Sequence, residues 1–96
     1  GAGLCIDAGC GTGMHLDTLA SRGWTVVGLD VSADQLRLAS RRWRSVVQGD
    51  VAWMPFSDAC ALRVVSVLTL TDFDDVAPFF HEVERVLCPG GRLVVI

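Results

Sequence analysis

Asp7-Ala8-Gly9-Cys10-Gly11-Thr12-Gly13 is the segment from which the rest of the chain can be interpreted. It follows the apolar run Leu4-Cys5-Ile6 and precedes a helical pattern near Met14, so it predicts a strand, a glycine turn and a helix start. Glycine permits positive φ and has no Cβ, so a ligand can approach the main chain closely. The free N–H groups of a helix start then face that ligand. We therefore expect a ligand site here.

The spacing of these glycines separates two classes of nucleotide-binding protein. A dinucleotide fingerprint has glycines at its first, third and sixth positions. Counted from Gly9, the sixth position is Met14. The spacing therefore argues against a nicotinamide-dependent oxidoreductase, which stays as the alternative from another enzyme class.

Four segments, in order, resemble the class I S-adenosylmethionine-dependent methyltransferases of the small-molecule, type 11/25 kind. IDAGCGTG resembles their first motif, and VVGLDVS, VVQGDVAWMPFSD and FFHEVERVLCPGGRLVVI follow. The resemblance covers essentially the whole chain. It implies an S-adenosyl-L-methionine cofactor and methyl transfer to a small-molecule acceptor that the sequence does not identify.

Apolar runs alternate with helical patterns along the chain. We expect strands at 4–7, 24–29, 45–48, 63–70 and 92–96 and helices at about 13–21 and 32–44, with a third helix between a cap at Asp74 or Asp75 and a stop at Pro89-Gly90-Gly91. Such alternation implies right-handed crossovers and a Rossmann-like, doubly wound parallel α/β sheet. The expected strand order is 3-2-1-4-5, which the resemblance also implies. We expect residues 1–96 to form a partial domain, a methyltransferase core truncated after strand five.

Acidic residues follow the predicted strands. Asp30 lies twenty-one residues after Gly9, where a carboxylate can accept from both hydroxyls of a ribose. The structural alternative is a solvated acid that caps a turn. The resemblance implies that Asp50 accepts from an adenine amino group and that the Val51 N–H meets the ring. An ordinary turn residue is the alternative for Asp50.

Further site residues follow from the resemblance. Asp7 would orient the glycine loop and the amino-acid end of the cofactor, and its carboxylate would be costly to bury without partners. Val31 would pack on the adenine, and Ser66 and Val67 would offer main-chain oxygens to the ammonium group. The complete expected set of cofactor-binding residues is Asp7, Gly9, Cys10, Gly11, Gly13, Asp30, Val31, Asp50, Val51 and Ser66.

No catalytic residue can be named from the sequence. His15 can line the pocket or lie on a helix surface, and a packing role is favoured for His81. Trp53 and Met54 border the adenine or form a small core lid. Where the family has Phe-Asp at the start of strand four, this chain has Ala61-Leu62. That departure keeps open a third interpretation, a non-catalytic cofactor-binding remnant.

The composition argues against several other classes of function. The net charge of −3, with scattered acids, argues against a nucleic-acid-binding surface. Cysteines without a C-x-x-C pair and only two histidines make a zinc site improbable. No membrane span or signal peptide is visible, so we expect a cytoplasmic protein, of unknown oligomeric state. We expect a solvated helix face to carry Arg37, Arg41, Arg42 and Arg44.

Overall fold

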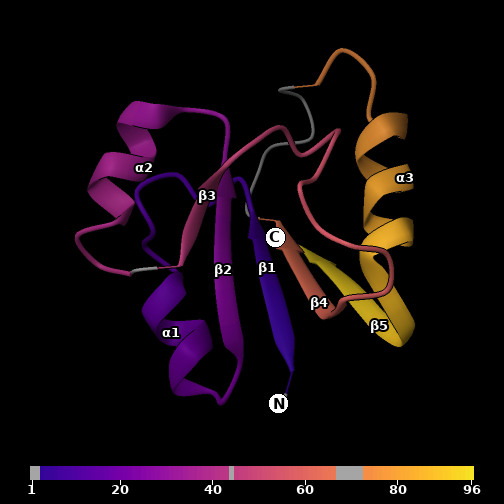
Figure 1. Ribbon diagram of the computed structural model, residues 1–96, viewed down its shortest axis with the longest axis horizontal. Coiled ribbons are helices and arrows are strands. Elements are labelled where there is room, and N and C mark those ends of the chain that lie inside the picture. The colour runs from indigo at the N-terminus through magenta and orange to yellow at the C-terminus, as the bar shows by residue number, and fades with distance from the viewer. Residues whose placement is uncertain (1–2, 44, 67–72) are drawn as a thin grey trace.

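The computed structural model describes residues 3–43, 45–66 and 73–96 (Figure 1). Five parallel strands form one sheet in the order β3-β2-β1-β4-β5, which confirms the predicted fold class and strand order. The elements are β1 (Leu4–Ala8), α1 (Leu16–Ser21), β2 (Thr25–Asp30), α2 (Ala33–Ala39), β3 (Val46–Gln48), β4 (Ala61–Ser66), α3 (Ala77–Val86) and β5 (Leu87–Val95).

Two apolar clusters hold helices on opposite faces of the sheet. On one face, α1 and α2 pack against β2 and β3, and their cluster is Cys10, Leu16, Val26, Leu36 and Ala39. On the other face, Phe79 and Val83 of α3 pack against Ile6 and Val64. Strand β1 lies at the centre of the sheet and is buried from Cys5 to Ala8, as continuous apolar character predicts for a central parallel strand.

The first two helices are shorter than predicted. Helix α1 begins at Leu16 and not near Gly13, because Gly11 and Gly13 have φ of 55° and 83°, which a right-handed helix excludes. Helix α2 ends at Ala39 and not near Arg44. The chain then turns back to the sheet, where Trp43 Nε1 donates to the Val26 carbonyl at 2.9 Å.

Strands β4 and β5 both begin earlier than predicted. Strand β4 starts at Ala61, which pairs with Leu87, and residues 67–70 of the predicted strand lie outside the described residues. The predicted stop at Pro89-Gly90-Gly91 is wrong, because β5 runs through it from Leu87 with a register shift against β4 between Ala61 and Arg63.

The third helix begins close to its predicted cap. The Ala77 N–H donates to Asp75 Oδ1 at 3.0 Å, and proline occupies the first helical turn, where its missing N–H costs nothing. The carboxyl ends of β1, β2 and β3 meet at one edge of the sheet and carry the glycine segment, Asp30 and Asp50. Among the described residues, no helix is long and apolar enough to cross a membrane.

Candidate functional site

Two adjoining hollows lie at the carboxyl edge of the sheet. The first, of about 240 Å³, is lined by Gly9, Asp30, Val31, Gly49, Asp50, Val51 and Phe73. The second, of about 430 Å³, is lined by Asp7, Gly9, Cys10, Gly11, Thr12, Met14, His15, Asp30 and Gln35. Because Gly9 and Asp30 line both, the two hollows meet there. Eight of the ten predicted cofactor-binding residues line one or the other.

The glycine loop is fixed against β2. The N–H groups of Gly9 and Cys10 both donate to the Leu29 carbonyl, at 2.7 and 2.9 Å. Gly13 lines neither hollow, and its role is close packing, because a Cβ there would lie 3.1 Å from the Cβ of Ala39 in α2. The loop backbone is therefore positioned by contacts on two sides. At Gly11, in contrast, an added Cβ would have no neighbouring atom within 4 Å, so the space beside this residue is open.

Asp30 joins the glycine loop to the start of α2. Its Oδ2 accepts from the Gly11 N–H at 2.8 Å, and its Oδ1 accepts from the Ser32 N–H at 2.9 Å. Ser32 in turn caps α2, because its Oγ accepts from the Gln35 N–H at 3.3 Å. A carboxylate has about four acceptor positions, so Asp30 can still accept from a ligand.

Asp7 is a buried carboxyl group that lines the second hollow. The residue is 1% exposed, and neither carboxyl oxygen has a hydrogen-bond partner among the residues that the structure describes. Burial raises the pKa of Asp7 to about 6; the charge of His15 lowers the pKa and that of Asp30 raises it. Because a buried carboxyl group without partners is unfavourable, this arrangement favours a ligand or water at Asp7.

Asp50 has the turn role that the sequence left as an alternative. Its Oδ1 accepts from the Ala52 N–H at 2.8 Å, and its carbonyl accepts from the Trp53 N–H at 2.9 Å. The turn leaves Oδ2 without a partner among the described residues, and Asp50 still lines the first hollow beside Val51. Val51 is 9% exposed and belongs to the core on the α3 side.

Phe73 is a lining residue that the sequence did not indicate. It borders the first hollow, and its ring stacks on Phe79 with 5.5 Å between centroids. Val31 lines the same hollow and is 68% exposed, which leaves its side chain available to a ligand. An aromatic residue just before the third helix was the only signal in the sequence.

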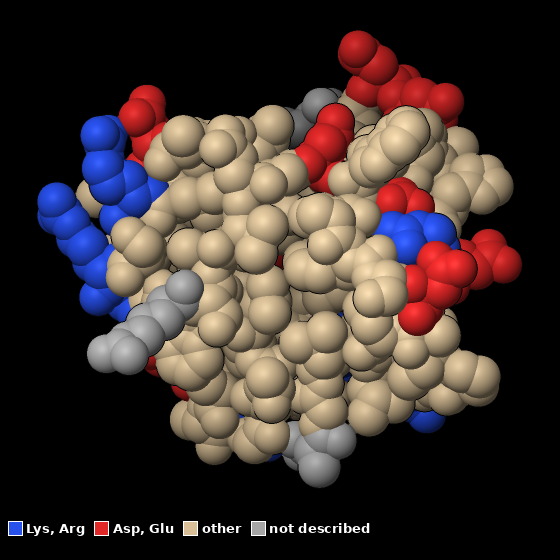
Figure 2. All heavy atoms as spheres, viewed as in Figure 1, with Lys and Arg blue, Asp and Glu red and all other residues tan. Residues whose placement is uncertain are grey.

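Arg85 and Glu82 attach the loop after β3 to α3, a role that sequence reasoning missed. The Arg85 guanidinium donates to the carbonyls of Met54 and Phe56 at 2.9 and 2.7 Å and to Asp58 Oδ1 at 2.8 Å. Glu82 Oε1 accepts from the Met54 N–H at 2.6 Å, and the hydrogen bonds from Arg85 lower the pKa of Glu82. Figure 2 shows blue and red atoms side by side on the α3 side of the molecule. The charged cluster holds in place the loop that carries Asp50.

The structure does not bring Ser66 to the site. Its carbonyl accepts from the Ile96 N–H at 2.9 Å within the sheet, the residue is fully buried, and it lines neither hollow. The predicted contact of the Ser66 carbonyl with an ammonium group stays a prediction, and Val67 lies outside the described residues.

The remaining predictions divide between core and surface. Met54 is 2% exposed and forms part of the core, whereas Trp53 is 82% exposed and lines a different hollow with Glu82 and Arg85. His81 is exposed on α3, so the packing role favoured for it is wrong. His15 lines the second hollow with Asp7. Within residues 3–43, 45–66 and 73–96, no group of three or more metal-ligating side chains occurs.

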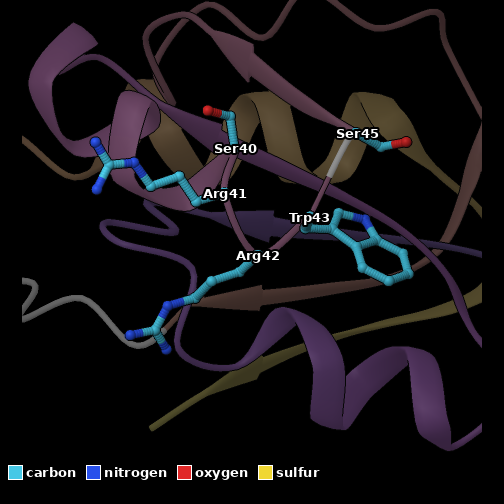
Figure 3. Close-up of a pocket in the computed structure, with 5 residues that line it drawn as sticks. All are labelled: Ser40, Arg41, Arg42, Trp43 and Ser45. Atoms are coloured by element: carbon cyan, nitrogen blue, oxygen red, sulfur yellow. The ribbon is translucent and has the colours of Figure 1, made fainter.

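A larger hollow, of about 530 Å³, lies at the turn after α2 and is lined by Ser40, Arg41, Arg42, Trp43 and Ser45 (Figure 3). Arg41 and Arg42 point away from the Trp43 ring, which is anchored to β2 through Val26. Both arginines follow the end of α2, and Arg44 lies outside the described residues. Within the described part of the predicted basic face, only Arg37 lies on α2, where it pairs with Asp34 at 2.9 Å. The glycine loop and the strand-end acids do not reach this hollow.

Comparisons with known proteins agree with this geometry. A family model described as "Methyltransferase domain" matches residues 6–95. The demethylmenaquinone methyltransferase of Tropheryma whipplei (strain Twist) is 36% identical over 98 residues, covering 94% of this chain and 39% of that protein.

Solved structures share the fold. One is a protein of Methanococcus maripaludis provisionally assigned as an S-adenosyl-L-methionine-dependent methyltransferase, with a TM-score of 0.92, 32% identity and coverage of 98% of this chain and 47% of that one. Another is the geranyl diphosphate C-methyltransferase of Streptomyces coelicolor A3(2), solved with Mg²⁺, geranyl diphosphate and S-adenosyl-L-homocysteine. Its TM-score is 0.88 at 27% identity, over 97% of this chain and 38% of that one. The chain spans less than half the length of these proteins.

Proposed function

The chain belongs to the methyltransferase domain family, and from that premise we propose that its two adjoining hollows bind S-adenosyl-L-methionine for methyl transfer to a small-molecule acceptor. The observation that carries the proposal is the shape of the site. The first hollow joins the second at Asp30, and the second hollow is lined by Asp7, a buried carboxyl group without a partner among the described residues. This shape fits a nucleoside linked to a positively charged amino acid.

The residues present fit this cofactor from end to end. The adenine would lie in the first hollow between Val31 and Val51, with Phe73 at its border and Asp50 Oδ2 open to the amino group. The ribose hydroxyls would lie at Asp30, where the hollows meet. The amino-acid end of the cofactor would lie in the second hollow, beside Asp7, Cys10, Gly11 and His15.

The chemistry requires little from the side chains. The cofactor supplies an electrophilic methyl group, and its thioether leaves without being protonated. The protein therefore contributes mainly alignment of the acceptor and exclusion of water. This explains why the residues that would hold the cofactor can be identified while no catalytic side chain stands out. The geranyl diphosphate methyltransferase, which acts on a small molecule, supports the class of acceptor.

A ligand titration tests the proposal. We expect S-adenosylhomocysteine to bind at least about tenfold more tightly than NADH or NADPH, since a tenfold ratio corresponds to about 1.4 kcal/mol. Isothermal titration of the full-length protein with each ligand measures this ratio. Equal or tighter binding of the dinucleotides would support the oxidoreductase alternative instead. Detection of methylated product separates an active enzyme from a non-catalytic remnant.

A further inference from the structure

The turn after α2 forms a surface hollow that the proposed cofactor site does not use. At about 530 Å³, this hollow is larger than either hollow of that site. Two hydrogen bonds fix the turn to β2: Trp43 Nε1 donates to the Val26 carbonyl at 2.9 Å, and the Gly28 N–H donates to the Ser45 carbonyl at 2.9 Å. The hollow is therefore held in shape by the sheet.

Arg41 and Arg42 carry the charge of this surface. Both side chains are exposed, and neither has an ion pair or a hydrogen bond to another side chain within residues 3–43, 45–66 and 73–96. In Figure 3 the two side chains extend to the same side of the turn and diverge, while the Trp43 ring extends to the other side. Two separated guanidinium groups are thus available to anions from outside the described fold.

The distribution of charge favours a short acidic partner over a nucleic acid. The chain has a net charge of −3, and Figure 2 shows basic side chains gathered beside α2 and acidic ones on the α3 side. A nucleic acid needs many phosphate contacts along a basic surface, and the acidic side of this molecule would repel a long polyanion. A few carboxylates match two guanidinium groups, which can each bind a carboxylate through two parallel hydrogen bonds.

Trp43 gives the hollow an apolar wall beside these charges. Its ring is half-buried and packs against the apolar cluster between α2 and the sheet. Tryptophan and arginine are the residues most enriched where protein partners bind, because both bury a large area and retain polar groups that can pair. We therefore expect the partner to place an apolar side chain against Trp43, with carboxylates on either side of it.

We propose that the turn after α2 is a docking surface for an acidic segment of a partner protein. Its carboxylates pair with Arg41 and Arg42, and an apolar side chain of the same segment enters the hollow beside Trp43. The proposal goes beyond the proposed function and does not depend on it. Helix α2 separates the two sites, since Gln35 near its start lines the second cofactor hollow and Ser40 at its end lines this one.

A synthetic peptide tests the proposal on the full-length protein. The probe is a short, fluorescein-labelled peptide of glutamate and aspartate with one central leucine, and its binding is measured by fluorescence anisotropy at about 0.15 M salt, where screening limits long-range attraction. We expect it to bind at least about tenfold more tightly than the same peptide with a central serine, because burial of leucine contributes that much. The serine peptide has the same charge, so it is the matched control for attraction by charge alone.

Variants assign the binding to the turn. Arg41→Glu and Arg42→Glu should each weaken binding of the leucine peptide by about fivefold or more, because a like charge then faces the carboxylates. Arg92→Glu makes the same change of charge on the exposed surface of β5 and should leave the affinity unchanged. Circular dichroism establishes that all three variants are folded, and S-adenosylhomocysteine should bind them as it binds the unmodified protein.

Several outcomes would overturn the proposal. They are absence of peptide binding, equal affinity for the leucine and serine peptides, or the same loss in Arg92→Glu as in the two turn variants. Tighter binding of a single-stranded deoxythymidine oligonucleotide would show a nucleic-acid surface instead. Sedimentation velocity tests the remaining occupant: self-association of the full-length protein that Arg41→Glu removes would assign the turn to a second copy of the chain.

Discussion

Asp30 connects three parts of the candidate site through one carboxylate. It accepts from Gly11 in the glycine loop and from Ser32 at the start of α2, and it lines the wall shared by both hollows. The sequence placed it at the ribose and left a turn cap as the alternative. The structure shows that it caps the turn, and the free acceptor positions keep the ribose contact as a prediction.

Replacing Asp30 by Ala should weaken binding of S-adenosylhomocysteine by roughly tenfold to a hundredfold. Hydrogen bonds to a charged group contribute about 1.5–3 kcal/mol, which corresponds to that range. Calorimetry measures the dissociation constant, and circular dichroism establishes that the variant is folded. Asp34→Ala is the matched control, because Asp34 is exposed and pairs only with Arg37 among the described residues. A folded Asp30→Ala with unchanged affinity would remove Asp30 from the site.

At the scale of elements, the loop after β3 depends on α3. Residues 49–60 contain no helix or strand of their own, yet they supply Asp50 and Val51 to the first hollow. Arg85 donates to two carbonyls and a carboxylate of this loop, although it belongs to α3, which follows β4 in the sequence. The loop is therefore positioned by tertiary contacts and not by local structure.

Replacing Arg85 by Ala should release this loop. We expect the Tm to fall by several degrees and the amide of Met54 to exchange faster with solvent, because carbonyls of the loop lose their donors. Arg85→Lys should recover little, since a lysine cannot reproduce the fork of donors. Thermal denaturation and hydrogen exchange measure both effects, with Arg92→Ala on the exposed surface of β5 as control. Unchanged exchange at Met54 would show that the loop is held by other contacts.

At the scale of the whole molecule, charge and hydrophobicity are unevenly distributed. Blue side chains gather beside α2 in Figure 2, while acidic ones gather over the α3 side. Strand β5 forms one edge of the sheet. Its last residue, Val95, is 43% exposed, and the following Ile96 is 77% exposed. An apolar edge strand is a template for pairing with another chain.

The isolated 96-residue segment should therefore self-associate through β5. Sedimentation velocity over a range of protein concentrations should show species larger than a monomer. Val95→Lys should reduce their proportion, because a charge on an edge strand opposes pairing. Ser40→Lys adds the same charge in the exposed turn after α2 and should have no effect. A segment that stays monomeric at every concentration would contradict this prediction.

The sequence by itself determined the sheet order, the glycine turn and the position of the acids at strand ends. These features depend on short-range patterns, such as Gly9-Cys10-Gly11, and on the right-handed crossover rule, which leaves few topologies open. Helix and strand ends were less predictable, because positive φ at Gly13 and the pairing of Leu87 with Ala61 overrode local propensity.

Only the tertiary structure decided which of those residues share a site and what each one contacts. Arg85 lies 31 residues from Met54, and a contact across that distance leaves no periodic signal in the sequence. The same holds for Asp7, because the strands that flank it decide that its carboxyl oxygens have no partner among the described residues. Ser66 lines neither hollow, and its carbonyl accepts from the Ile96 N–H thirty residues further along the chain. Hydrogen-bond partners are set by which segments the fold brings together, and that information becomes available only when the sheet is assembled.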